Sequence, residues 1–266
     1  MLHILALVAA TTVEPVVSTE WLQTHLNDSQ VRVIFTGDRG EYDAAHIPGA
    51  RFIDHMETVG SQHRLLPSDA IARALARAGA EDGTHVVLYG ESPMTTGWLY
   101  MTFAAIGHGG DVSLLEGGVK LWQAEKRSIS AAVPPPGGGR LTVHPAADVI
   151  VDAAWVRSHL NSGAVRILDV RTTEEWKHGH LPGATLVLWQ NLFADERSLK
   201  LKSLGDIRAL LASAGVGPND EVVTYCAVGM RASLMYWAAR AVGIPARVYV
   251  GSFEDWRRDS TNPIVR

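Results

Sequence analysis

The chain contains 266 residues, enough for one large domain or two domains of ordinary size. Hydrophobic residues make up 47% of the chain and charged residues 20%, which is typical of a folded globular protein and excludes a disordered one. The formal net charge of −4 gives no general attraction to nucleic acid, and the single cysteine excludes an internal disulfide.

The chain begins with MLHILALVAATTVEP, a short apolar run without the Lys or Arg that opens a signal peptide. The run is also too short to cross a bilayer. We interpret it as an N-terminal segment of the fold, with a degenerate export signal as the alternative. We therefore expect a cytoplasmic protein without a membrane partner, and the periplasm is the alternative compartment.

Strand and helix patterns alternate through the first half of the chain. VRVIF (31–35) is a β-branched run typical of a strand, and DAIARALARAG (69–79) predicts a helix closed by Gly79. THVVLYG (84–90) predicts a second compact strand. Such alternation indicates a parallel sheet with helices on both faces.

A run of three prolines and three glycines, VPPPGGGR (133–140), interrupts this pattern. Such a run cannot continue a helix or lie inside a sheet, so we interpret it as a linker. We place the linker at residues 131–145, between a first domain at 14–130 and a second domain at 146–266. The second half is the more basic one, with 15 Lys/Arg against 13 Asp/Glu.

The second half repeats the alternation of strands and helices. VRILDV (165–170) and EVVTYC (221–226) predict strands. DIRALLASAG (206–215) predicts a helix closed by Gly215, and LMYWAARAVG (234–243) is apolar at helical spacing. The predicted fold is therefore α/β, with two similar domains that each contain a parallel sheet covered by helices.

Four blocks of sequence occur twice, in the same order and at nearly constant offset. Three pairs are 134 residues apart and one pair is 136 residues apart. The pairs are STEWLQTHL (18–26) with DAAWVRSHL (152–160), EYDAAHIPGARF (41–52) with EWKHGHLPGATL (175–186), ARAGAEDGTHVVLYG (76–90) with ASAGVGPNDEVVTYC (212–226), and LLEGGVKLW (114–122) with VYVGSFEDW (248–256). The chain is therefore two homologous domains in tandem.

The only cysteine, Cys226, closes a predicted strand and opens a loop before a helix. Ligands of parallel α/β folds lie beyond the carboxyl ends of strands, where loop N–H groups and the helix dipole stabilise an anion. The same setting favours the thiolate, the nucleophilic form of cysteine. Gly229 permits a tight turn, and Arg231 can offer a fork of donors to an oxyanion. A lone cysteine after an apolar strand is, however, often a packing residue.

The motif CAVGMR (226–231) resembles the active-site loop of the rhodanese family of sulfurtransferases. LDVR (168–171), GHLPGA (179–184) and GSFEDW (251–256) also resemble rhodanese landmarks, in the expected order. The tandem arrangement is similar to thiosulfate and 3-mercaptopyruvate sulfurtransferases, in which the second domain carries the cysteine and the first is catalytically silent. The position in the first half that matches Cys226 is Gly90, and Thr95 matches Arg231.

The resemblance implies a two-step sulfur transfer without a metal or cofactor. Cys226 is the expected nucleophile, which takes sulfane sulfur from a small anionic donor and passes it to cyanide or to an external thiol. The expected substrate-binding groups are Arg231 and the loop residues Ala227, Val228, Gly229 and Met230. We expect thiosulfate as the donor, with 3-mercaptopyruvate as the alternative. The loop sequence AVGM leaves this choice open, because it is neither strongly basic nor small and polar. We also expect a monomeric protein.

Three alternatives to this enzyme remain. The chain could be a carrier that only holds a persulfide for a partner, or a pair of degenerate domains with a packing cysteine. It could also be a cysteine phosphatase or arsenate reductase of similar topology. Phosphatases have their arginine six residues after the cysteine, whereas Arg231 follows Cys226 by five residues and Ala232 is at six. The tighter loop suits sulfur better than phosphate.

A few other residues are candidates for supporting the pocket. Asp169 and Arg171 end a strand at the same sheet edge, and their alternative role is an ion pair that steadies the loop with Glu175. Arg64 lies in QHRLLPS (62–68), which resembles a segment facing the cleft of tandem rhodaneses. His46 and His180 occur in equivalent turns of both halves, which favours a structural role.

Overall fold

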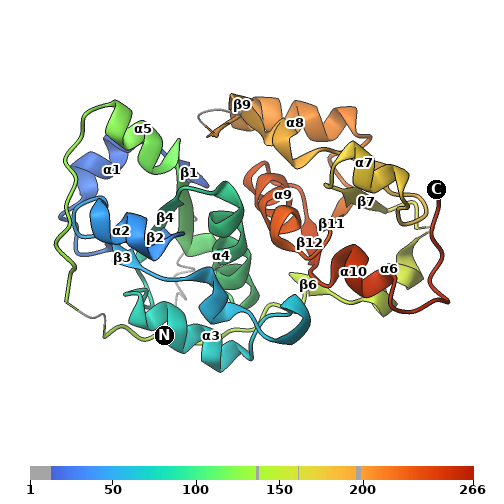
Figure 1. Ribbon diagram of the computed structural model, residues 1–266, viewed down its shortest axis with the longest axis horizontal. Coiled ribbons are helices and arrows are strands. Elements are labelled where there is room, and N and C mark those ends of the chain that lie inside the picture. The colour runs from blue at the N-terminus through green and yellow to red at the C-terminus, as the bar shows by residue number, and fades with distance from the viewer. Residues whose placement is uncertain (1–12, 136–137, 161, 196–198) are drawn as a thin grey trace, which may run out of the picture.

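The computed structural model describes residues 13–135, 138–160, 162–195 and 199–266. Residues 1–12 of the predicted N-terminal segment lie outside this part of the chain. Two α/β domains lie side by side, with the first half at one end of the molecule and the second half at the other (Figure 1). Within the described residues, no helix has both the length and the apolar character that a membrane crossing requires.

The first domain consists of five strands and five helices in the described residues. They are β1 (Val16–Val17), α1 (Thr19–His25), β2 (Val31–Thr36), α2 (Arg39–Ala44), β3 (Arg51–Phe52), α3 (Ser68–Arg77), β4 (His85–Gly90), α4 (Pro93–Ala105), β5 (Val112–Leu115) and α5 (Gly118–Ala124). Short 3-10 turns at His55–Thr58 and Ser61–His63 connect β3 to α3.

The second domain repeats this series at the offset that the sequence predicts. Its elements are β6 (Ile150–Val151), α6 (Ala153–His159), β7 (Val165–Asp169), α7 (Thr173–Lys177), β8 (Thr185–Leu186), α8 (Leu204–Ser213), β11 (Glu221–Tyr225), α9 (Met230–Ala241), β12 (Ala246–Tyr249) and α10 (Ser252–Trp256). A two-stranded ribbon, β9 (Phe193–Asp195) with β10 (Lys200–Leu201), precedes α8.

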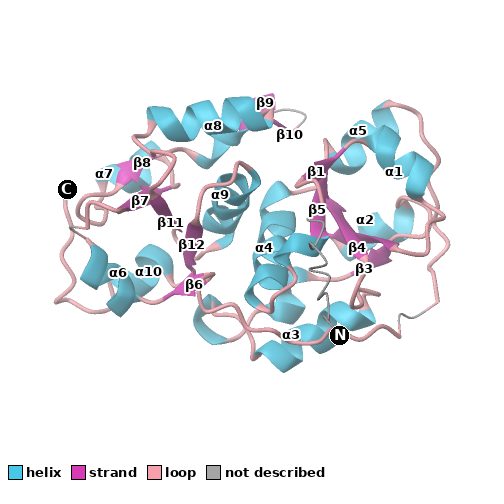
Figure 2. Ribbon diagram, turned by 180° about the vertical axis from the view of Figure 1, so that it is seen from behind, coloured by secondary structure: helices cyan, strands magenta, loops and turns pink. Residues whose placement is uncertain are grey.

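Both five-stranded sheets have the same topology. The strand order is β1-β5-β4-β2-β3 in the first domain and β6-β12-β11-β7-β8 in the second, and every pair in these two sheets is parallel. The helices that join the strands cover both faces of each sheet (Figure 2). The α/β fold with two tandem domains, predicted from the sequence, is confirmed.

Apolar side chains form one shared core and two outer cores. On β4, Val86 and Leu88 face the shared core, whereas Val87 and Tyr89 face the outer core of the first domain. β11 shows the same alternation, as expected for strands covered on both faces. The shared core contains buried residues of α3, α4, α8 and α9, so the two domains do not have separate interiors.

The domains meet where α4 packs against α9 (Figures 1 and 2). Residues 96–104 of α4 and 232–239 of α9 are buried on every side, as their continuous apolar sequences require. The helices approach closely at Gly97, where a Cβ would lie 2.7 Å from the Cα of Leu234. Further along, the rings of Tyr100 and Tyr236 lie 6.1 Å apart.

The predicted linker is attached to the first domain along part of its length. The carboxylate of Asp82 accepts hydrogen bonds from the backbone and hydroxyl of Thr142. The backbone N–H of His144 donates to the carbonyl of Ile106 at 2.9 Å. The segment after the proline–glycine run is therefore held against the first domain by hydrogen bonds.

The equivalent histidines of the two halves cap short helices. The imidazole of His46 stacks on Tyr42 with ring centroids 4.1 Å apart, and its Nδ1 bonds to the carbonyl of Tyr42. His180 stacks on Trp176 in the same way, with centroids 3.5 Å apart. These contacts agree with the structural role predicted for both residues.

Gly97→Ala is expected to destabilise the protein although alanine is the better helix former by about 1 kcal/mol. The added methyl group would meet the backbone of Leu234, and separating α4 from α9 should cost about 1–3 kcal/mol net. Urea unfolding measures this change. The matched control is Gly163→Ala, where a Cβ has no neighbour within 4 Å. Equal midpoints for the two variants would contradict the close helix crossing.

Candidate active site

The residues of the CAVGMR motif form a short loop at the carboxyl end of β11. The strand ends at Tyr225, residues 226–229 form the loop, and α9 begins at Met230. Gly229 has φ of 93°, and a Cβ there would lie 2.8 Å from the carbonyl oxygen of Val250. Only glycine fits this turn without displacing the chain after β12.

Cys226 is held by hydrogen bonds on both sides. The backbone N–H of Gly229 donates to its Sγ at 3.1 Å, and its own N–H donates to the hydroxyl of Ser252 at 3.0 Å. The N–H groups of Phe253 and Glu254 donate to the carbonyls of Cys226 and Ala227. Cys226 is 1% exposed, so it is enclosed by the packed elements around the loop.

Arg231 leaves the first turn of α9 and forms a bidentate ion pair with Glu175, with both N–O distances 2.7 Å. Glu175 is fixed by the capping box of α7, in which it pairs with Thr172. The hydrogen bonds from Arg231 lower the pKa of Glu175 to about 2. The bonds with Glu175 raise the pKa of Arg231, and the neighbouring Cys226 adds to this effect.

Asp169 and Arg171 form a buried ion pair behind the loop, with the closest atoms 2.6 Å apart. Arg171 also donates to the carbonyl of Gly179, and the hydroxyl of Tyr225 donates to Asp169 at 2.5 Å. The expectation that Glu175 joins this pair was wrong, because Glu175 is occupied by Arg231. Since both side chains are at most 3% exposed, they stabilise the ends of β7 and β11 and do not face an open pocket.

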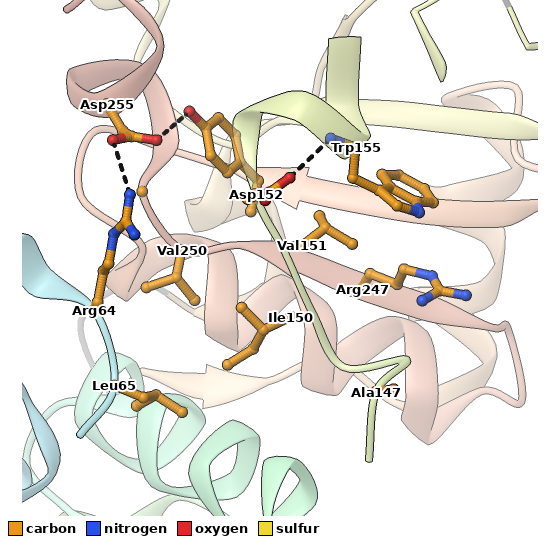
Figure 3. Close-up of a pocket in the computed structure, with 12 residues that line it drawn as sticks. Arg64, Leu65, Ala147, Ile150, Val151, Asp152, Trp155, Arg247, Val250 and Asp255 are labelled. Atoms are coloured by element: carbon orange, nitrogen blue, oxygen red, sulfur yellow. Dashed lines mark hydrogen bonds and ion pairs between the residues drawn. The ribbon is translucent and has the colours of Figure 1, made fainter. Parts of the chain in front are cut away.

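Arg64 reaches across from the first domain into an interdomain pocket (Figure 3). The pocket has a volume of about 510 Å³ and is lined by Leu65, Ile150 and Val250 among others. The guanidinium of Arg64 lies 3.6 Å from Asp255, which also accepts a hydrogen bond from Tyr249. Arg64 therefore lines a pocket behind Val250, and its ion pair is with α10 and not with the Cys226 loop.

The equivalent edge of the first domain has a different backbone. β4 extends to Gly90, which pairs with Thr36 of β2, so that only two residues remain before α4 begins at Pro93. A Cβ on Gly90 would lie 2.0 Å from the carbonyl oxygen of Thr36. Thr95, at the position of Arg231, bonds to the carbonyl of Ser92. This edge has neither a thiol nor room for one.

Within the described residues, no cluster of three or more His, Cys, Asp or Glu side chains could hold a metal ion. The groups gathered around Cys226 are backbone N–H donors, one hydroxyl and one paired guanidinium. The N–H of Gly229 and the guanidinium of Arg231 can stabilise a thiolate and a persulfide on Cys226, because both sulfur species carry negative charge. The hydroxyl of Ser252 instead accepts a hydrogen bond from the backbone of Cys226.

A model of the rhodanese-like domain matches the chain twice, at residues 18–125 and 152–259. The second match contains the whole site around Cys226, and the first contains the equivalent sheet edge at Gly90. The chain therefore belongs to the rhodanese family, with two domains in tandem.

Relatives along most of the chain are sulfurtransferases and a sulfur carrier protein. The chain is 30% identical over 280 residues to the sulfur carrier protein TtuD of Thermus thermophilus, covering 95% of this chain and 97% of that protein. It is 30% identical over 237 residues to a thiosulfate sulfurtransferase of Pseudomonas aeruginosa, covering 84% and 86%. A probable 3-mercaptopyruvate sulfurtransferase of the same organism is 28% identical over 247 residues, covering 84% and 85%. The chain is thus a member of the sulfurtransferases.

Solved structures show the same fold. SseA from Escherichia coli superposes with a TM-score of 0.80 at 22% identity, covering 91% of this chain and 99% of that one. YnjE superposes with a TM-score of 0.84 at 22% identity, covering 95% and 68%.

Two contacts of the site were not predicted from the sequence. The hydroxyl of Ser252 holds Cys226, and the only signal for it was that the repeat has glycine, Gly118, at the equivalent position. The pair of Arg231 with Glu175 joins residues 56 positions apart. The sequence T-x-x-E at Thr172 indicated that Glu175 would point back to its own helix start, although not that it would also reach Arg231.

Glu175→Gln is expected to lower stability at neutral pH, and this effect should shrink toward zero as the pH falls to 2 and below. The pKa of Glu175 is lowered from 4.5 to about 2 in the folded protein, so its stabilisation is complete above about pH 4.5 and is lost as the pH falls through 2. Thermal melts of both proteins between pH 7 and pH 2 measure the difference.

The matched control is Glu174→Gln, on the same helix, whose partner is the exposed Lys177. Its effect on the melting temperature should be small, because exposed ion pairs contribute little. A constant gap between wild type and Glu175→Gln from pH 7 to pH 2 would rule out the ion pair with Arg231 as its cause.

Proposed function

We propose that this chain is a thiosulfate sulfurtransferase that transfers sulfane sulfur through a persulfide on Cys226. The observation that carries the proposal is the N–H of Gly229 directed at Sγ at 3.1 Å, in a loop closed by Arg231. A donor aimed at Sγ stabilises the thiolate and the persulfide derived from it. The silent first domain, in which Gly90 replaces the cysteine, matches a division into one catalytic and one supporting domain.

The first step forms one S–S bond and breaks another. The Cys226 thiolate attacks the outer sulfur of thiosulfate, and sulfite leaves with the electron pair of the broken bond. In the second step, cyanide or an acceptor thiolate attacks the outer sulfur of the persulfide, and Cys226 leaves as the thiolate. No external oxidant or reductant is needed, because each step exchanges one sulfur partner for another.

The acceptor must come from outside the chain. Cys226 is the only cysteine of the sequence, so the persulfide cannot collapse to a disulfide with a neighbour. The loop therefore has to keep a charged persulfide until the second substrate arrives. The N–H groups of the loop and of the first turn of α9 are the protein groups that can stabilise this charge.

A 3-mercaptopyruvate donor is the second candidate, and the ion pair of Arg231 supports it. Glu175 compensates the charge of Arg231 at 2.7 Å, which weakens the attraction of the site for a dianion such as thiosulfate. A monoanionic donor is affected less. Relatives that carry the thiosulfate and the 3-mercaptopyruvate names are about equally similar to this chain, so donor kinetics must decide.

Cys226→Ser is expected to lower sulfur transfer on the order of 10³-fold or more, since it removes the nucleophile. Wild-type protein treated with donor should gain about 32 Da, the mass of one sulfur atom in a persulfide, and the variant should not. Intact-mass spectrometry and cyanide turnover measure both effects. A variant that keeps the adduct and the turnover would show that the sulfur is carried elsewhere.

The identity of the donor is tested by kcat/KM with thiosulfate and with 3-mercaptopyruvate on the same preparation. We expect the higher value with thiosulfate, and a fall of about 10–100-fold in Arg231→Ala from the loss of a charge-assisted contact. Arg166→Ala, which removes an exposed arginine paired with Asp220, is the charge control. A wild-type preference for 3-mercaptopyruvate would replace the thiosulfate proposal with the second candidate.

A further inference from the structure

We propose that Ser252 is a positioning residue for sulfur transfer, which holds Cys226 out of the β11 strand so that the N–H of Gly229 points at Sγ. This inference rests on the proposed role of Cys226. Ser252 is the first residue of α10, 26 positions after Cys226, and its side chain is 0% exposed. It touches the backbone of the reacting residue and has no described contact with Sγ itself.

The direction of the hydrogen bonds at Ser252 follows from its single proton. Its hydroxyl donates to the carbonyl of Tyr249 at 2.9 Å, which leaves a lone pair for the N–H of Cys226 at 3.0 Å. The next two N–H groups of the chain, from Phe253 and Glu254, hold the carbonyls on the other side of Cys226. The first residues of α10 therefore form hydrogen bonds with both the N–H and the carbonyl of Cys226.

The backbone conformation of Ser252 carries a penalty in free energy. Its φ is 55°, in the left-handed region that residues with a Cβ occupy at a penalty in free energy. The equivalent residue of the first domain is Gly118, which has the same φ of 55° without that penalty. The turn itself therefore needs only glycine, and what serine adds is the hydroxyl that binds Cys226.

The two domains show what happens with and without this hydroxyl. In the first domain, Gly90 continues the strand, and a Cβ on Gly118 would lie 2.8 Å from the carbonyl oxygen of Gly90. In the second domain, the strand ends one residue earlier, and the N–H of Cys226 meets the side chain of Ser252. The serine side chain and the early end of the strand thus occur together.

The consequence for the reaction lies in the orientation of the loop. The bond from Gly229 to Sγ requires the Cys226 peptide to leave the direction of β11. Without the hydroxyl, this peptide loses its buried acceptor and the loop loses its fixed orientation. Persulfide formation should therefore slow, while the affinity for the donor changes little, because Ser252 is buried behind the loop.

The decisive variant is Ser252→Gly, which removes the hydroxyl and relieves the backbone strain together. We expect its melting temperature to equal or exceed that of the wild type, while the rate of persulfide formation falls roughly tenfold at unchanged KM. Alkylation by iodoacetamide reports on the loop independently, since Cys226 is the only thiol. The alkylation rate at a fixed pH should differ from that of the wild type, because the Gly229 N–H no longer holds Sγ in place.

Two further variants complete the test. Ser252→Ala keeps the strain and loses the hydroxyl, so it should be less stable than the wild type and as slow as Ser252→Gly. Lys126→Gly relieves similar strain at an exposed residue of the first domain with φ of 56°, and should leave persulfide formation and alkylation unchanged. A purely structural serine predicts that activity follows the melting temperature through the series.

Wild-type rates and a wild-type alkylation profile in Ser252→Gly would overturn the assignment. The same holds if the rates of all three variants simply follow their melting temperatures. The proposed function fails on a different observation, namely that the wild-type protein forms no persulfide with any donor. The alkylation profiles would still show whether Ser252 orients Cys226.

Discussion

The packing of α4 against α9 is the constraint on which the rest of the molecule depends. These helices are buried on all sides, and together with α3 and α8 they fill the space between the two sheets. Because α9 starts directly after the Cys226 loop, the position of the loop is set by a helix that cannot move without opening the shared core. A closely packed interior thus provides a rigid platform for a site built mainly from backbone groups.

The two domains differ at the carboxyl ends of the equivalent strands β4 and β11, where the chain follows a different path. β4 remains paired with β2 as far as Gly90, whereas the pairing of β11 with β7 ends at Tyr225. The second loop is two residues longer, which lets the N–H of Gly229 turn toward the sulfur of Cys226. The same sheet order therefore carries a cysteine loop in one copy and a continued strand in the other.

The repeat and the periodic patterns predicted nearly all of the architecture. Helix ends at Gly79 and Gly215 and the strand alternation were readable because each depends on residues close together in the chain. The position of Cys226 at a strand end was predictable for the same reason. Contacts between distant elements were not, as shown by Glu175, which pairs with Arg231 and not with Asp169 and Arg171. Which of two nearby cations a carboxylate reaches depends on helix placement, which local sequence does not encode.

The strand that runs through Gly90 also bears on how such a tandem protein can change over time. A cysteine at this position would collide with the carbonyl of Thr36 before it could act as a nucleophile. A cysteine could be accommodated there only if the strand ended earlier and the turn at Gly118 changed with it. A single substitution at Gly90 therefore cannot build the Cys226 site in the first domain, because the strand path and the turn at Gly118 both leave no room for a side chain.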